Sequence, residues 1–245
     1  MEVHKHPHHV THKKKWTEYL LEFFMLFLAV FLGFVAENIR EISVERHREK
    51  EYIRNMVQNL KDDTTQLSWC IQQLRLTLHK LDTLVYLTKA DLTVPGNLKT
   101  ATRLAIDAGS YTIFMSNNAT IVQLKSGNLR LIQTNHAADS ILKYDYLTAI
   151  TVRQGEQYSF SFNECILSAE HVFDITQFMG TTYGKVTAVV PPPVTTNKAT
   201  LKLYANKAAV YFISARNYVQ LLKFQLNYAK RLIDYLKKEY HLENE

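Results

Sequence analysis

The longest hydrophobic stretch of the chain lies near its N-terminus. Residues 23–36, FFMLFLAVFLGFVA, contain no charged side chain, and residues 19–21 extend the apolar run to about 18 residues if Glu22 is included. At about 1.5 Å per residue, a helix of this length reaches roughly 27 Å, close to a hydrocarbon core of about 30 Å. The pattern predicts a single-pass transmembrane helix over residues 16–38.

Beyond this span, apolar residues recur in alternating steps of four and three between residues 53 and 85. This spacing is typical of a heptad seam, and it predicts a long coiled-coil-like helix over residues 44–92. Thr64 is the one polar residue at a seam position. The sequence leaves open whether the seam packs against another copy or another part of the chain. Its apolar members are Ile53, Val57, Leu60, Leu67, Ile71, Leu74, Leu78, Leu81 and Val85.

The rest of the chain also has helical periodicity. A second long helix is predicted over residues 199–242, because its apolar residues again step by three and four. Shorter helices are expected within residues 99–178, where Gly155 is a candidate kink and a strand pair is an alternative. Residues 180–198 contain PPP and form the predicted Pro-rich loop. We therefore predict an all-α fold in which residues 39–245 form an antiparallel helical bundle.

Composition agrees with this architecture. The chain has 7 Gly and 5 Pro in 245 residues, so it is poor in the residues that make turns in sandwiches and barrels. The net charge of +6 is interleaved with acids, which argues against a nucleic-acid-binding stripe. Cys70 and Cys165 lie in apolar contexts. We expect them to be buried thiols, with a disulfide as the alternative.

Residues 1–15 form a polar tail rich in histidine and lysine. The tail is expected to be solvated, with zinc, nickel or copper binding as a weaker alternative. Three contiguous lysines end it directly before the span, which favours a cytoplasmic N-terminus, although arginines follow the span as well. Residues 34–36 make a poor cleavage site, so an uncleaved signal anchor is predicted. The candidate metal ligands are His4, His6, His8, His9 and His12.

Three residues within the span are candidates for function. Glu22 is an acid inside a membrane segment, where a charged side chain is costly. It could handle protons or pair with a partner helix. The alternative without a function is that its side chain reaches the membrane interface. Ala29 and Gly33 form a small-xxx-small pair that lets two helices approach closely. The steps of seven and four residues place all three on one helix face.

The order of these features resembles a family of uncharacterised single-pass proteins from Bacteroidetes-type bacteria. The first shared motif joins an acid near the start of the span to a charged helix: Tyr19, Glu22, Glu37, Asn38 and Asn59–Leu60–Lys61–Asp62–Asp63. The second comprises Leu124, Ser126, Gly127, Leu129, Leu131, Ile132, Asn135, Tyr144 and Tyr146. The resemblance implies an inner-membrane anchor with an extracytoplasmic, hence periplasmic, helical domain. It implies no activity.

No phosphate-binding loop, zinc-protease motif, CxxC or nucleophile elbow occurs in the sequence. We therefore expect a protein that is not an enzyme and needs no cofactor. The leading hypothesis is an interaction or scaffold subunit of an inner-membrane complex, which self-associates or binds protein partners through the span and the coiled-coil helices. The alternative is a single-span subunit of an ion-driven or translocation assembly that uses Glu22.

Overall fold

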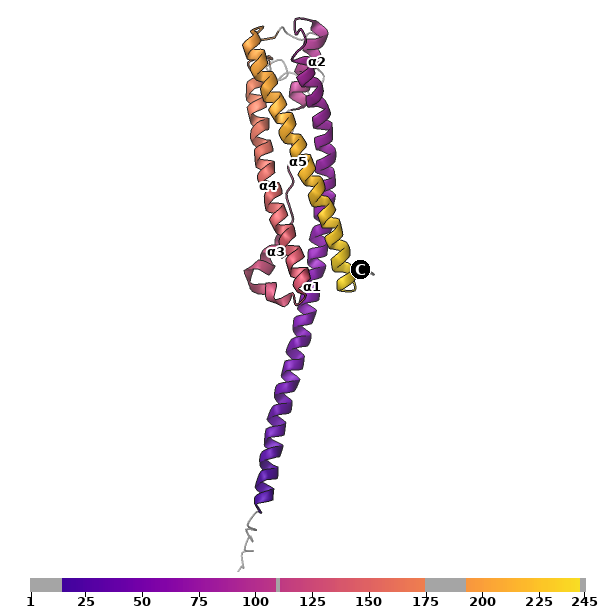
Figure 1. Cartoon of the computed structure of the whole chain (residues 1–245), viewed down its shortest axis with the longest axis vertical. Helices are drawn as coiled ribbons and strands as arrows, with labels where there is room; N and C mark the ends of the chain where they lie inside the picture. The colour runs from indigo at the N-terminus through magenta and orange to yellow at the C-terminus, as the bar shows by residue number, and fades with distance from the viewer. Residues whose placement is uncertain (1–14, 109–110, 175–192, 243–245) are drawn as a thin grey trace, which may run out of the picture. The chain divides into compact units, whose positions relative to one another are not determined.

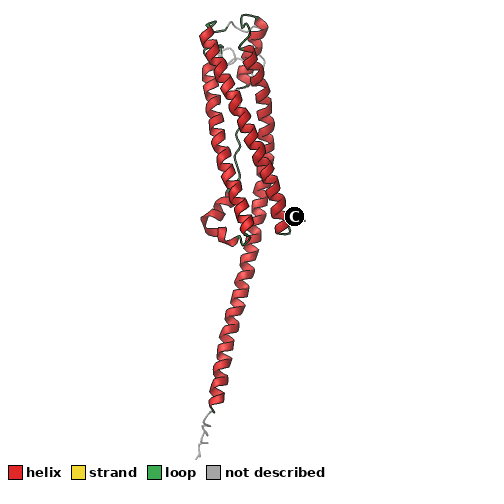
Figure 2. Ribbon diagram, in the orientation of Figure 1, coloured by secondary structure: helices red, strands yellow, loops and turns green. Residues whose placement is uncertain are grey.

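The computed structural model describes residues 15–108, 111–174 and 193–242. These residues form helices and connecting segments with no strand among them (Figure 2), which confirms the predicted all-α fold. The chain divides into two compact units, residues 1–49 and residues 50–245. The first unit contains the predicted span, and the second contains the helical bundle.

The first helix, α1 (Trp16–Leu87), contains both the predicted span and the predicted seam. It ends five residues earlier than predicted, because Asp91 starts a turn in which its carboxylate accepts hydrogen bonds from the Thr93 amide and hydroxyl at 2.8 and 2.7 Å. Pro95 opens α2 (Pro95–Asp107), where its missing N–H would have had no helical partner.

An extended segment, residues 111–118, follows α2 and leads into a series of short turns. These are α3 (Ala119–Gln123), the π-helical turn η1 (Leu124–Asn128) and the 3-10 turn η2 (Leu129–Leu131). Gly127 has a φ of 130°, which L side chains rarely adopt, so glycine is required where η1 ends. Two short helices are predicted over residues 99–134 with a break near residue 109, and α2 and α3 lie on either side of that position.

The two remaining helices are α4 (Asn135–Ala169) and α5 (Lys198–Glu239). Helix α4 begins at Asn135, and Thr134 is its N-cap residue. The helix ends at Ala169, before the predicted limit of 178, and it is helical where the strand pair was considered. Most of the predicted Pro-rich loop, residues 180–192, lies outside the described residues.

The second unit is a bundle whose columns alternate in direction (Figure 1). The bundle part of α1 and helix α4 run the same way, and α5 runs opposite to both. The second position of the bundle is not filled by one continuous helix. Helix α2, the extended segment and α3 follow one another along it. Helices α4 and α5 are in the closest contact. A Cβ at Gly155 would lie 3.1 Å from the Tyr218 hydroxyl, so this glycine permits close packing, and α4 runs through it without interruption.

Candidate functional site

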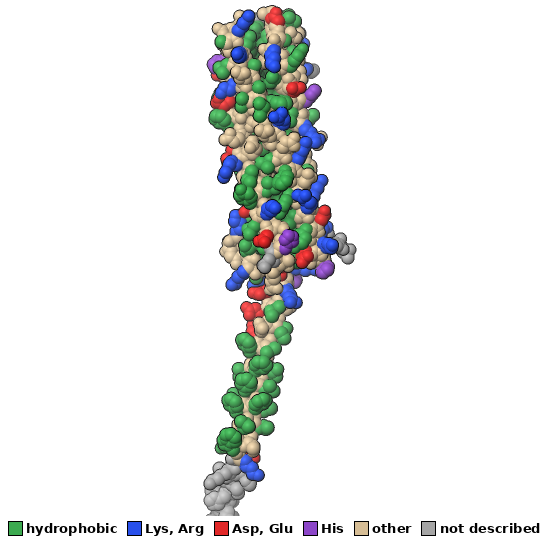
Figure 3. Space-filling model, viewed as in Figure 1, with side chains coloured by type: hydrophobic (Ala, Val, Ile, Leu, Met, Phe, Trp, Pro, Cys, Tyr) green, Lys and Arg blue, Asp and Glu red, His purple; other side chains and the backbone are tan. Residues whose placement is uncertain are grey.

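The first unit, residues 1–49, carries the three residues predicted within the span. Side chains of the most hydrophobic 18-residue window of α1 are not buried by the rest of the described chain, and the helix is long and apolar enough to cross a membrane. Figure 3 shows hydrophobic side chains along the visible face of this segment. Glu22, Ala29 and Gly33 are all exposed on one continuous helix, so their spacing places them on a common face.

The seam of α1 is occupied within the chain. Most of its apolar members are less than 9% exposed, and Leu78 and Val85 are partly buried against the same core. The partner that the sequence left open is therefore the chain's own bundle.

A buried polar layer separates two hydrophobic clusters of the bundle. On α1 the clusters meet between Leu60 and Leu67, and on α5 between Leu222 and Ala229. Asp63 and Gln225 lie in these gaps and are 1% and 0% exposed. Buried polar groups of this kind need hydrogen-bond partners, so their contacts show what the layer does.

Asp63 is the centre of the layer. One carboxylate oxygen accepts hydrogen bonds from the Tyr144 hydroxyl at 2.6 Å and the Ser116 hydroxyl at 2.7 Å. The other accepts from the Asn117 backbone N–H at 2.8 Å. Burial, and then the nearby Asp63 carboxylate, raise the pKa of Tyr144 far above its ordinary value, so the phenol stays a donor. The carboxylate thus joins α1, α4 and the extended segment.

Gln225 extends the layer to α5. Its side-chain amide donates to the Thr148 hydroxyl at 2.9 Å, and that hydroxyl donates to the Tyr144 carbonyl at 3.0 Å. Beside the layer, the Asn59 side chain accepts bonds from the Thr120 amide and hydroxyl at 3.3 and 2.5 Å. The start of α3 is therefore also held against α1.

A group of buried tyrosines holds the other half of the extended segment. The Phe114 amide donates to the Tyr218 hydroxyl at 2.9 Å, and the Cys70 thiol donates to the Ile113 carbonyl at 3.5 Å. Tyr158 stacks on Tyr218 with ring centroids 5.3 Å apart. Burial raises the pKa of Tyr218 to about 12, so its hydroxyl stays protonated at physiological pH. Side chains of α1 and α5 replace the backbone partners that a sheet would give this segment.

The predicted thiols are confirmed as free and buried. Cys70 and Cys165 are 0% and 3% exposed, and no disulfide joins them. Burial raises their pKa values to about 11 and about 12. Both sulfur atoms therefore behave as small core groups at neutral pH.

The sequence pattern identifies Thr64 as the polar residue of the α1 seam, but the polar residue that makes contacts across the bundle is its neighbour Asp63. Thr64 donates to the Lys61 carbonyl of its own helix at 2.8 Å, whereas the neighbouring Asp63 crosses the bundle. Asp63 and Tyr144 are members of the first and second motifs named above. The structure brings these motifs together, a contact that spacing along the sequence did not reveal.

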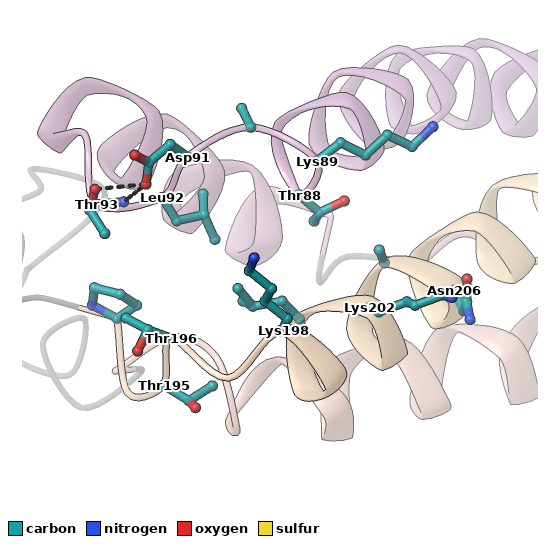
Figure 4. A pocket seen from close by; sticks show the side chains of 14 residues that line it. Thr88, Lys89, Asp91, Leu92, Thr93, Thr195, Thr196, Lys198, Lys202 and Asn206 are labelled. Atoms are coloured by element: carbon teal, nitrogen blue, oxygen red, sulfur yellow. Dashed lines mark hydrogen bonds between the residues drawn. The ribbon is translucent and has the colours of Figure 1, made fainter.

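A cavity of about 780 Å³ lies where α1 ends and α5 begins (Figure 4). Lys89, Lys198 and Lys202 line it together with Asp91. In Figure 4 the Lys198 amine extends into the space, while Lys89 and Lys202 extend along their own helices. The three amines do not converge on one point, so the cavity is not a formed anion site.

Within the residues described, no cluster of His, Cys, Asp and Glu has the geometry to hold a metal ion. The five candidate histidines of the tail lie outside the described residues. Comparisons with protein-family models, curated proteins and solved structures give no match to this chain.

Proposed function

We propose that the protein is a membrane-anchored interaction subunit. Residues 16–38 hold it in a bacterial inner membrane with the N-terminus in the cytoplasm, and the helical bundle contacts protein partners in the periplasm. The observation that supports this proposal is the apolar segment of α1, whose most hydrophobic 18-residue window is 0% buried within the described chain. A helix of this kind needs lipid or other spans around it.

The chemistry of the span indicates how partners would be held. Hydrophobic burial gives little drive for association between helices inside lipid, so tight backbone approach and polar contacts determine it. Ala29 and Gly33 provide a face on which a second helix can approach closely, and a Cβ at Gly33 would meet no atom within 4 Å. Glu22 lies on the same face and adds a polar contact for a partner span.

Mass spectrometry of the chains that co-purify after gentle detergent extraction tests the proposal. We expect a defined complex, and we expect Gly33→Leu to weaken it because the added side chain keeps two helices apart. Val30→Leu is the matched control, because Val30 is also exposed in the span but lies about 80° around the helix from the centre of that face. Recovery of only the monomer from wild-type membranes would contradict the proposal.

Glu22→Gln separates this proposal from the transport alternative. Loss of the complex would mean that Glu22 acts in packing. An intact complex that has lost an ion-dependent activity would favour a subunit of an ion-driven or translocation assembly.

A further inference from the structure

The outward face of α5 carries an ordered stripe of uncharged residues. Leu203, Val210, Ile213 and Phe224 are 55%, 54%, 47% and 55% exposed, on the side of the helix opposite its buried residues. Amide side chains complete the stripe in alternating steps of three and four. Its members in order are Leu203, Asn206, Val210, Ile213, Asn217, Gln220, Phe224 and Asn227.

The absence of charge from this stripe is unusual for its helix. Helix α5 contains nine Lys and Arg residues but only two acids, Asp234 and Glu239. None of these charges occupies a stripe position between Leu203 and Asn227, and the same steps reach charged residues only beyond Asn227, at Arg231, Asp234 and Lys238. A face that meets only water is normally charged, because charged side chains are the best solvated. The spacing and the neutral composition together are those of a helix–helix seam.

We propose that this stripe, named the α5 seam, packs in parallel against the α5 seam of a second copy of the chain. The inference rests on the proposed function, and it identifies the partner of the bundle as the same protein. In a parallel pair with two-fold symmetry, identical residues meet. Each amide both donates and accepts, so Asn217 can bond to Asn217 of the partner subunit, whereas a charge at a seam position would repel its own copy.

The flanking lysines favour the parallel arrangement. An antiparallel pair centred on Ile213 would place Lys202 beside Lys223 of the partner subunit, and the two would repel. A parallel pair instead places Lys202 near Lys207 of the partner subunit. Lys207 forms an ion pair with Glu164 of its own chain, which offsets its charge. Two copies inserted in one membrane also share the same orientation.

The seam is small for a freestanding dimer. Four half-exposed apolar side chains fall well short of the roughly 800 Å² per partner that stable interfaces bury. A bilayer raises the effective concentration of anchored copies, so a weak contact between bundles adds to any contact between spans. We therefore expect the seam to associate in membranes.

Cysteine cross-linking of the full chain in lipid nanodiscs or native membranes tests this inference. Asn217→Cys should give a disulfide-linked dimer under mild oxidation. Arg216→Cys is the matched control, because it is also exposed but lies about 100° around the helix, off the seam. The parent chain contributes no background, because its two cysteines are buried. Adding Val210→Glu to Asn217→Cys should abolish the dimer band, since it places like charges opposite each other.

Selective cross-linking of the Asn217→Cys variant would support the seam. Equal cross-linking of the Asn217→Cys and Arg216→Cys variants would show random collision and overturn it, as would no cross-linking of either. If anionic vesicles protected the thiol of Asn217→Cys from a thiol reagent without dimer formation, the face would be assigned to a membrane surface and the seam rejected. A complex that survives while Asn217→Cys fails to cross-link would refute the seam and leave the proposed function standing.

Discussion

Replacing Asp63 by alanine should destabilise the bundle more than any other single change in the polar layer. The substitution removes the acceptor for the Tyr144 hydroxyl, the Ser116 hydroxyl and the Asn117 amide. Tyr144 is 0% exposed, so its hydroxyl cannot bond to water instead, which costs about 1–3 kcal/mol. Ser116 and Asn117 lie nearer the surface and recover part of their loss.

We expect a total loss of about 3–4 kcal/mol in the free energy of unfolding, given the lost bonds to a charged acceptor. For a domain of this size the loss corresponds to a fall of roughly 10 °C in Tm. The assay is thermal unfolding of the full chain in detergent, followed by circular dichroism. Asp62→Ala is the control, because Asp62 is the exposed neighbour and should cost less than about 1 kcal/mol.

A double-mutant cycle makes the reasoning sharper. Tyr144→Phe alone should cost about 1.5–3 kcal/mol, because it removes a bond to a charged group. In the Asp63→Ala background the same change should be nearly neutral, since the hydroxyl has already lost its partner. Equal losses for Asp63→Ala and Asp62→Ala, or additive losses in the cycle, would refute the central role given to Asp63.

Three further predictions concern Gly155 and the two buried cysteines. Gly155→Ala should destabilise the bundle despite the higher helix propensity of alanine, because the new methyl group would crowd the Tyr218 hydroxyl, which the Phe114 amide holds in place. Gly96→Ala is the control. No atom lies within 4 Å of a Cβ there, so this change should be neutral or stabilising in the same thermal melt. Both cysteines should resist alkylation in the native protein at pH 8 and react after unfolding. Folding raises the pKa of Cys70 from an ordinary 9.0 to about 11 and that of Cys165 to about 12. The unfolded chain therefore loses these protons first, and the free energy of unfolding, which is unaffected below pH 9, should fall as the pH rises toward the folded pKa values. Urea titrations between about pH 8 and 11 measure this fall.

The elements that the sequence predicts well are those whose signal is local and periodic. The span and the two long helices follow from runs and spacings of apolar residues, and burial of the α1 seam agrees with its heptad pattern. The predicted ends of the helices were less accurate than their existence. The Asp91 turn stops α1 early, and no local breaker marks Ala169 as the end of α4.

The polar layer was not predictable, because it depends on contacts between residues far apart in sequence. Asp63 and Tyr144 are 81 positions apart, and nothing in the local pattern distinguishes Asp63 from the exposed Asp62. The extended segment had the same limitation. No local pattern marks its length, because the side chains that hold it, Tyr218 among them, come from other parts of the chain.

Membrane attachment is tested most directly by alkaline carbonate extraction of membranes that contain the full chain. If residues 16–38 form an anchor, the full chain stays in the membrane pellet, while a chain that begins at residue 50, where the bundle unit starts, appears in the supernatant. Release of the intact full chain by the wash would contradict the anchor and with it the proposed function.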